Sequence, residues 1–152
     1  MDTTHSDFMK IAIAEAEKAQ KKGEVPIGAV VVAENQDVLA TEHNQTITLN
    51  DPTAHAEILA LRTAAARVGN YRLLNTTLYV TVEPCPMCMG AVIHARVSRL
   101  VFGPRDTKWG AAGSLYNFAQ DHRFNHQPMI VEGIREADCK KLLQDFFRQK
   151  RR

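Results

Sequence analysis

Two short segments carry side chains that could bind a metal ion. The first reads His55-Ala56-Glu57, and the second contains Cys85 and Cys88 with two residues between them. Residues three apart share one face of a helix, so both sulfurs can point at one ion. Thiolate sulfur together with imidazole nitrogen suits Zn²⁺. The sequence therefore predicts one zinc ion held by His55, Cys85 and Cys88.

The number of ligands indicates what this zinc ion would do. Three protein ligands leave one coordination position open, which is typical of catalytic zinc, whereas structural zinc usually has four ligands. The open position would hold water, whose pKa zinc can lower to about 7. Glu57 lies two residues from His55 and could take a proton from that water. The pattern therefore predicts a catalytic zinc ion with an activated water and an acceptor for its proton close by.

Other interpretations of the cysteine pair have less support. A redox-active Cys-x-x-Cys pair does not need a His-x-Glu segment upstream. A zinc finger needs paired histidines, and His122 and His126 lie too far beyond Cys88 for that motif. The remaining histidines and cysteine have no partner pattern. We expect surface or hydrogen-bonded core histidines and a small buried apolar cysteine, at His5, His43, His94 and Cys139.

The elements that must position these residues alternate between helix and strand. Helical spacing covers residues 7–22, 86–95 and 136–149, and a short helix is expected near 115–119. Asp51 and Pro52 suit the cap and first residue of a helix over 51–68, which would place His55 one turn inside it. Cys85 would cap the 86–95 helix, which puts Cys88 in its first turn. Strands are expected at 26–32, 38–41, 77–82, 99–102 and 129–132.

This order predicts an α/β fold with three layers, α/β/α, around a five-stranded mixed sheet flanked by helices, because parallel strands need helical crossovers. The 152 residues, 45% hydrophobic and 24% charged, suit one globular domain over 1–152. No apolar run approaches the roughly 20 residues of a membrane span, and no secretory signal is recognisable. We therefore expect a cytoplasmic protein without membrane contact.

The positive charge of the chain is concentrated at its C-terminal end. The formal net charge is +2, and Arg148, Lys150, Arg151 and Arg152 lie within the last five residues. Such a cluster can contact nucleic-acid phosphates. It can equally be a solvated helix end, where positive charge is favourable to the helix dipole without any partner.

The His-Ala-Glu and Pro-Cys-x-x-Cys motifs together form the signature of zinc deaminases that act on nucleobases. Further segments, in order along nearly the whole chain, resemble the bacterial tRNA-specific adenosine deaminase family. They are residues 24–30, 51–57, 70–73, 77–85, 102–106, 110–114 and 145–148, together with Asn44. The resemblance implies a cytidine-deaminase-like fold and deamination of adenosine to inosine at the wobble position of tRNA anticodons, with arginine tRNA expected.

The same resemblance implies partners and site residues. The partners are a tRNA anticodon stem-loop and a second copy of the chain, with one Zn²⁺ per subunit. Glu57 would shuttle protons to the base. The residues expected to contact the substrate are Ile27, Asn44, Ala56, Asp106, Lys108, Asn125, Phe147 and Arg148. Pro104 and Trp109 depart from the small or polar residues usual at those positions, and Trp109 could stack on a flanking base or pack at a subunit contact.

Two alternatives stay open at the level of sequence. A deaminase of free guanine or cytosine shares the metal motif, although it has no need for the 105–114 loop or the basic end. A non-catalytic zinc-dependent RNA-binding module is the other, and Glu57 argues against it because a structural site has no use for an acid/base group.

Overall fold

The computed structural model describes residues 2–151, with side chains from residue 4 onward. Arg152 of the basic C-terminal cluster lies outside the described residues. The elements of the described part are, in chain order, α1 (Asp2–Lys21), β1 (Gly28–Val32), β2 (Val38–His43), α2 (Ala56–Val68), β3 (Thr77–Val80), α3 (Pro86–Ala95), β4 (Arg99–Phe102), a 3₁₀ turn η1 (Phe118–Gln120), β5 (Met129–Val131) and α4 (Glu136–Lys150).

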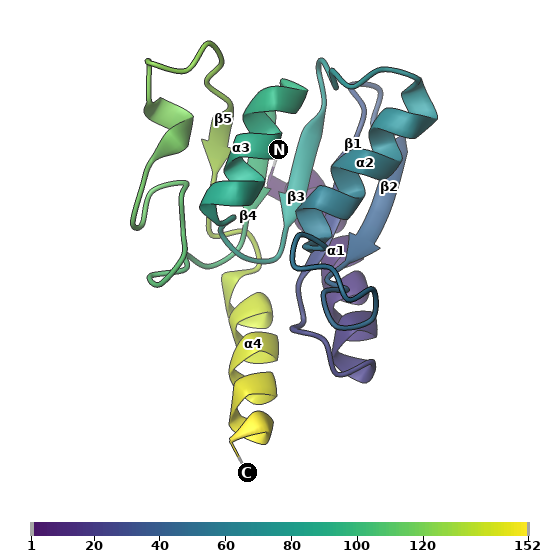
Figure 1. Ribbon diagram of the computed structural model, residues 1–152, viewed down its shortest axis with the longest axis vertical. Helices are drawn as coiled ribbons and strands as arrows, with labels where there is room; N and C mark the ends of the chain where they lie inside the picture. The colour runs from purple at the N-terminus through teal and green to yellow at the C-terminus, as the bar shows by residue number, and fades with distance from the viewer. Residues whose placement is uncertain (1, 152) are drawn as a thin grey trace.

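The five strands form one mixed sheet in the order β2-β1-β3-β4-β5 (Figure 1). β1 runs antiparallel to both β2 and β3. β3, β4 and β5 run parallel to one another. The α3 helix connects β3 to β4, as a parallel pair requires. The predicted five-stranded mixed sheet is confirmed.

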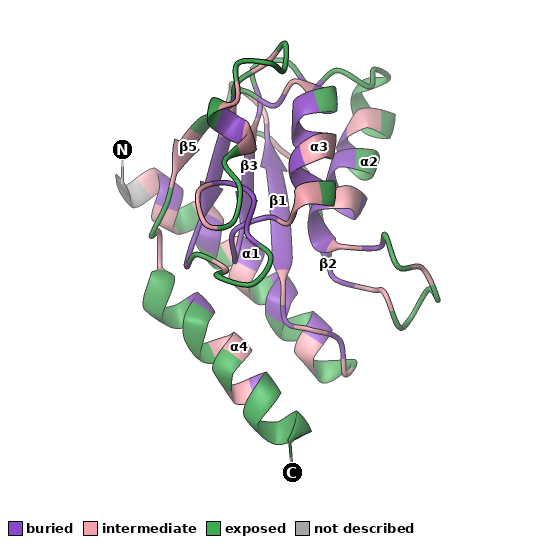
Figure 2. Cartoon of the chain, turned by 60° about the vertical axis from the view of Figure 1, so that its left-hand side comes forward, coloured by how far each residue is buried: buried purple, intermediate pink, exposed green. Residues whose placement is uncertain are grey.

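Alternating side chains of the strands build two cores, one on each face of the sheet. Val31 of β1 and Leu78 of β3 pack with apolar residues of α2 and α3. Val30 of β1 and Tyr79 of β3 pack on the other face, with α1 and with Cys139 of α4. The central strands β1 and β3 are buried between these helices (Figure 2). The predicted three layers are therefore confirmed.

Gly28, at the start of β1, lets α1 lie directly against the sheet. A Cβ atom built on Gly28 would lie 1.9 Å from the backbone oxygen of Ala12 in α1. Any other residue would force the helix away from the strand. Ile27, an expected substrate contact, and the end of β2 lie next to this contact. The packing of α1 therefore fixes the position of Ile27.

The prediction that a helix begins at Asp51 and Pro52 is wrong. The Asp51 carboxylate accepts hydrogen bonds from the backbone N and the hydroxyl of Thr53, at 2.8 and 2.7 Å, and so closes a local turn. The helix starts only at Ala56, and His55 is its cap. A side chain that bonds its own neighbouring backbone favours turns over helix interiors. The helix expected near 115–119 is only the η1 turn.

None of the described helices combines the length and the apolar character needed to span a membrane.

Candidate active site

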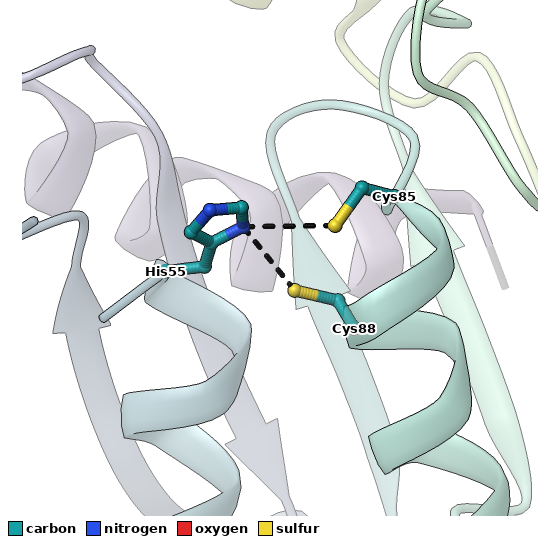
Figure 3. A group of neighbouring side chains, drawn as sticks. All are labelled: His55, Cys85 and Cys88. Carbon is teal, nitrogen blue, oxygen red and sulfur yellow. Dashed lines mark hydrogen bonds between the residues drawn. The ribbon is translucent and has the colours of Figure 1, made fainter. Parts of the chain in front are cut away.

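His55 and the two cysteines meet because two helices start side by side. His55 caps α2 with extended backbone angles, and Cys85 caps α3 in the same way, with Pro86 as the first helical residue. Cys88 follows in the first turn of α3. His55 Nδ1 lies 3.7 Å from Cys85 Sγ and 3.5 Å from Cys88 Sγ (Figure 3).

These distances fit a tetrahedral zinc centre. Bonds of about 2.3 Å to sulfur and about 2.0–2.1 Å to nitrogen require nitrogen and sulfur to be roughly 3.5–3.6 Å apart. All three ligand atoms lie within 4.8 Å of one another. Within the described residues, this trio is the group of histidine, cysteine and acidic side chains that could hold a metal ion. The residues therefore fit the predicted zinc ion.

The protonation of the sulfurs agrees with this fit. A hydrogen bond from Cys88 lowers the pKa of Cys85 to about 4, and a hydrogen bond with His55 adds to the effect against the opposing effect of burial. The same contact with Cys85, together with burial, raises the pKa of Cys88. Without a cation between them the two sulfurs do not both carry a negative charge, so Cys85 is the thiolate and Cys88 keeps its proton. A zinc ion would supply the charge that lets both bind as thiolates.

Glu57 presents one unpaired carboxylate oxygen to the same place. Its side chain is 3% exposed, and among the described residues no donor lies within hydrogen-bond distance of Oε1. Burial raises the pKa of the Glu57 carboxyl. A carboxyl group with a raised pKa holds a proton more readily than an exposed one. The role of Glu57 as general acid and base stays a prediction.

A cavity of about 560 Å³ opens over the metal ligands. Such a volume is within the usual range of about 300–1,000 Å³ for small-molecule sites. His55, Glu57 and Cys85 contribute to its lining, and Val82 and Ile27 give it apolar walls. The other lining residues come from several segments of the chain and are Val25, Asn44, Thr46, Pro52, Glu83, Pro86, Met87, Asp106, Trp109 and Phe147.

Buried Glu83 holds the loop that closes one side of this cavity. Its Oε1 accepts from the backbone N of Asp106 at 3.0 Å and from the hydroxyl of Ser114. Its Oε2 accepts from the backbone N of Ala112 at 2.9 Å and of Ser114 at 3.0 Å. A Cβ atom on Gly110 would lie 2.3 Å from the Glu83 carboxyl carbon, so only glycine lets the loop wrap this closely.

Buried Glu24 holds the loop on the other side. Its carboxylate accepts from the backbone N of Ile47 at 3.2 Å, and from the backbone N and hydroxyl of Thr48 at 2.6 and 2.7 Å. Burial acts to raise the pKa of Glu24, but the hydrogen bonds from Thr48 and Ile47 outweigh it and lower the pKa. Each wall of the cavity thus depends on one buried carboxylate.

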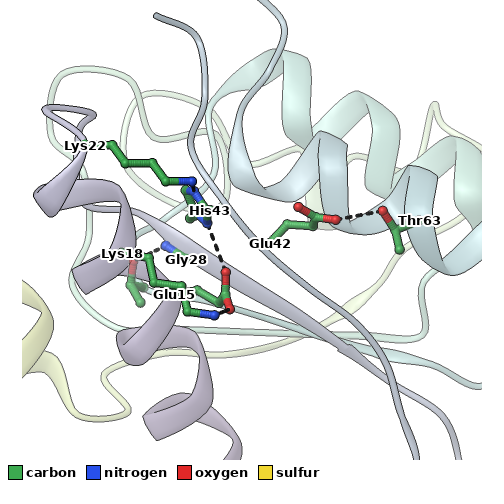
Figure 4. Close-up of polar contacts among 8 residues, drawn as sticks. Glu15, Lys18, Lys22, Gly28, Glu42, His43 and Thr63 are labelled. Atoms are coloured by element: carbon green, nitrogen blue, oxygen red, sulfur yellow. Dashed lines mark hydrogen bonds and ion pairs between the residues drawn. The ribbon is translucent and has the colours of Figure 1, made fainter. Parts of the chain in front are cut away.

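A polar network ties the end of β2 to α1 just before Asn44. His43 Nδ1 donates to Glu15 Oε1 at 3.0 Å, and Lys22 Nζ donates to His43 Nε2 at 3.2 Å (Figure 4). Lys18 also pairs with Glu15, at 2.8 Å. The backbone N of Asn44 then donates to the oxygen of Ile27 at 3.0 Å. These contacts fix the position at which Asn44 enters the cavity wall.

The residues expected to contact substrate fall into two groups. The first group lines the cavity and contains Ile27, Asn44, Asp106 and Phe147. Ala56 is buried behind it, as the first residue of α2. The second group lies on the surface outside the cavity and contains Lys108, Asn125 and Arg148. Their contacts with substrate stay predictions.

The histidines and the cysteine without a partner pattern lie away from the metal ligands. Cys139 is 1% exposed in the core, as expected for a small apolar side chain. His5 and His43 are hydrogen-bonded core residues, and His5 Nδ1 lies 2.8 Å from the Tyr79 hydroxyl. His94 is on the surface.

Sequence reasoning missed the roles of Glu24 and Glu83. Both belong to segments that carry the family resemblance, but nothing in their spacing indicates a loop contact. One sequence feature could have indicated such a role: a charged residue next to a strongly apolar strand, because a charged group buried there needs several hydrogen bonds. Glu83 is such a residue, since it follows directly after Thr81 and Val82.

Comparisons with known proteins agree with this site. Residues 2–104 match the model of the cytidine and deoxycytidylate deaminase zinc-binding region. The chain is 47% identical over 95% of its length to a tRNA-specific adenosine deaminase of Haemophilus influenzae, 83% of which is covered. It is 50% identical over 95% of its length to the Bacillus subtilis protein of the same name, 89% of which is covered.

A solved structure extends the agreement to the fold. It comes from work on A-to-I editing by tRNA:A34 deaminases at the wobble position of transfer RNA. The TM-score is 0.87 at 42% identity, over 90% of this chain and 99% of that chain. The metal ligands, the sheet and these similarities agree, and the chain belongs to the cytidine and deoxycytidylate deaminase family, among the tRNA-specific adenosine deaminases.

Proposed function

We propose that this chain catalyses the hydrolytic deamination of adenosine to inosine at the wobble position of a tRNA anticodon. The observation that carries the proposal is the convergence of three zinc ligands with the unpaired Glu57 carboxylate oxygen at one cavity. The names of relatives at 47% and 50% identity support adenosine in tRNA, rather than a free base, as the substrate.

The chemistry follows from the groups at the base of the cavity. Zinc held by His55, Cys85 and Cys88 would supply Lewis-acid activation of water, lowering its pKa to about 7. Glu57 takes one proton from that water and gives it to N1 of the adenine, which makes C6 a better electrophile, and the water oxygen forms a bond to C6. Glu57 then passes the second proton from that oxygen to the amino group, the bond from C6 to the amino nitrogen breaks, and C6 becomes a carbonyl carbon. Adenosine and water become inosine and ammonia.

The cavity walls suit a nucleoside that has left its stack. Ile27 offers an apolar surface to the base, and the amide of Asn44 can hydrogen-bond a purine edge. Asp106 offers a carboxylate that can accept a hydrogen bond from a ribose 2′-hydroxyl, a group that DNA lacks. These contacts would favour adenosine in RNA.

The rest of the stem-loop needs contacts with its phosphates. A groove of about 680 Å³ runs beside α4, and Lys140, Arg148 and Arg151 contribute to its lining. Lys108 and Asn125 are exposed and available for further contacts.

We also propose that the chain acts as a homodimer in the cytoplasm, and sedimentation of the purified protein tests the dimer.

The test is inosine formation by the zinc-loaded protein. Substrates are an adenosine-containing anticodon hairpin of arginine tRNA, the same hairpin with deoxyadenosine at the target, free guanine and free cytosine. We expect inosine from the RNA hairpin, slower reaction with deoxyadenosine and no reaction with the free bases. Deamination of guanine or cytosine without activity on the hairpin would replace this proposal by a free-base deaminase.

A further inference from the structure

Trp109 is the one tryptophan of the chain, and it lies at the rim of the cavity. Its side chain is 67% exposed, although it belongs to the same lining as Glu57 and Asp106. Phe147 of α4 is a second exposed aromatic residue of this lining. Exposed apolar surface beside a pocket marks a contact region for a ligand or partner.

The backbone that carries Trp109 is fixed before any ligand binds. The backbone N of Trp109 donates to the side-chain Oδ1 of Asp106 at 3.1 Å, and the backbone N of Gly110 donates to the backbone oxygen of Asp106 at 2.8 Å. Glu83 accepts hydrogen bonds from residues on both sides of this turn. A side chain carried by a fixed backbone loses less conformational entropy on binding than one carried by a mobile loop.

The chemistry around the ring suits a nucleobase. When one base of a single-stranded loop enters the cavity, its neighbours lose their stacking partner and lie at the rim. Unstacked bases stack on aromatic side chains, and any of the bases can do so because each has a π face. The exposed ammonium of Lys108, next in the chain, suits the phosphate of the same nucleotide.

We propose that Trp109 is the stacking platform for the base of one nucleotide adjacent to the target adenosine. The inference rests on the proposed function, because it requires RNA with its target base in the cavity. The alternative occupant is a second copy of this chain, which the test must separate from RNA.

Intrinsic fluorescence tests the platform directly, since Trp109 is the single tryptophan. The zinc-loaded Glu57→Ala protein is titrated with the anticodon hairpin, and with hairpins carrying an abasic site on the 5′ or the 3′ side of the target. We expect quenching by the intact hairpin and its loss with one of the two abasic hairpins. Binding without quenching, or equal quenching by both abasic hairpins, would overturn the proposal.

Substitutions separate stacking from general apolar contact. Trp109→Ala should weaken hairpin binding about 5- to 100-fold, in line with the usual effect of removing one stacked base. Trp109→Phe should stay within about threefold of the parent protein, and Trp109→Leu should resemble Trp109→Ala. Tyr71→Ala is the matched control, because Tyr71 is also 67% exposed but does not line the cavity. Equal binding by the leucine and phenylalanine variants contradicts stacking.

The outcomes for the platform and for the proposed function are distinguishable. If the parent protein deaminates the hairpin and Trp109→Ala binds it normally, the platform is wrong and the function stands. If the parent protein does not deaminate the hairpin, the function is wrong. Sedimentation of Trp109→Ala beside the parent identifies the other occupant, because loss of self-association with unchanged RNA binding assigns Trp109 to a subunit contact.

Discussion

Glu83 and Ser114 are joined by two hydrogen bonds to opposite oxygens of one carboxylate. The backbone N of Ser114 donates to Oε2 at 3.0 Å, and its hydroxyl donates to Oε1. Asp106 and Ala112 donate to the same two oxygens. Both sides of the loop that carries Trp109 therefore meet at one buried anion, and the shape of that cavity wall depends on it.

Replacement of this carboxylate by an amide should disturb the wall without removing the metal. In Glu83→Gln an NH₂ group faces hydrogen-bond donors that the carboxylate oxygen accepted. We expect the free energy of unfolding to fall by about 1–3 kcal/mol, as for a buried polar group left unsatisfied. The kcat/KM for the hairpin should fall at least about tenfold, mainly because KM rises. The variant should still bind one zinc ion per chain.

The matched control for this variant is Glu132→Gln. Glu132 pairs at 2.9 Å with Arg105, which belongs to the loop, but the two side chains are 42% and 51% exposed. Exposed ion pairs contribute only about 0–1 kcal/mol. Similar effects of the two substitutions on kcat/KM would show that burial of the Glu83 anion is not what shapes the loop.

Removal of the Glu57 carboxylate should abolish turnover and spare the metal. General acid–base catalysis contributes about 10²–10⁴-fold, and Glu57 serves two proton transfers, so Glu57→Ala should lose at least that much in kcat. Glu57→Gln should unfold at the same temperature as the parent or higher, because a neutral amide replaces a buried unpaired acid. Zinc content, kcat and thermal unfolding check this, and substantial activity in the zinc-loaded alanine variant would exclude the assigned role.

Loss of one metal ligand should differ sharply from loss of the other buried cysteine. Cys88→Ala removes a sulfur that lies 3.5 Å from His55 Nδ1, so it should lose stoichiometric zinc and activity. Cys139→Ala should keep one zinc per chain and most of the activity, because Cys139 packs in the core behind the sheet. Metal analysis and inosine formation after chelation and zinc return are the measurements. Equal zinc loss in both variants would refute the ligand assignment.

Glu24 should make stability depend on pH in the acidic range. Its pKa is lowered in the folded protein, so its stabilising effect is present above the unfolded value of about 4.3. That contribution is lost as pH falls through the lower folded value. Glu24→Gln should therefore reduce stability at pH 7 and give a shallower loss of stability below about pH 4.

Urea unfolding at a series of pH values compares this variant with Glu17→Gln, which replaces an exposed carboxylate of α1. We expect the Glu17 variant to follow the parent curve. If the free energy of unfolding fell equally steeply below about pH 4 in the parent protein and in Glu24→Gln, the hydrogen bonds from Thr48 would not be stabilising a charged Glu24.

The basic end of α4 should contribute to RNA affinity mainly through charge. Removal of residues 148–152 should weaken hairpin binding and reduce the slope of log affinity against log salt by about 0.7 for each phosphate that the protein no longer neutralises. Lys10→Gln removes an exposed charge of α1 and should change neither quantity. An unchanged salt slope in the truncated protein would leave the cluster as a solvated helix end.

The cysteine pair of the metal site could be predicted from sequence because its geometry is local, whereas His55 lies 30 residues away and is identified by the ligand preference of zinc. Cys85, Pro86 and Cys88 lie within one helical turn, and a helix start has a recognisable cap. His55 was correctly assigned as a ligand, but its helix starts later than expected. The Asp51 side chain bonds Thr53 instead of capping a helix, and propensity alone does not choose between these two uses of aspartate.

The cavity walls could not be predicted because they depend on contacts between distant segments. Glu24 binds a loop more than twenty residues away, and Glu83 binds a loop of similar separation. No spacing rule connects such residues. The same limit applies to Lys108, Asn125 and Arg148, whose expected roles come from resemblance and not from any periodicity.

Gly28 connects the packing of α1 to the wall of the substrate cavity. The missing side chain at that position lets the oxygen of Ala12 approach the strand, on the face of the sheet opposite the metal ligands. Its neighbour Ile27 belongs to the cavity lining, and the N and O of Gly28 itself bond Thr81, next to Val82. A methyl group added at Gly28 would force α1 and β1 apart, and Ile27 connects that displacement to the cavity wall. We therefore expect a substitution at Gly28 to lower activity although the residue itself does not contact RNA.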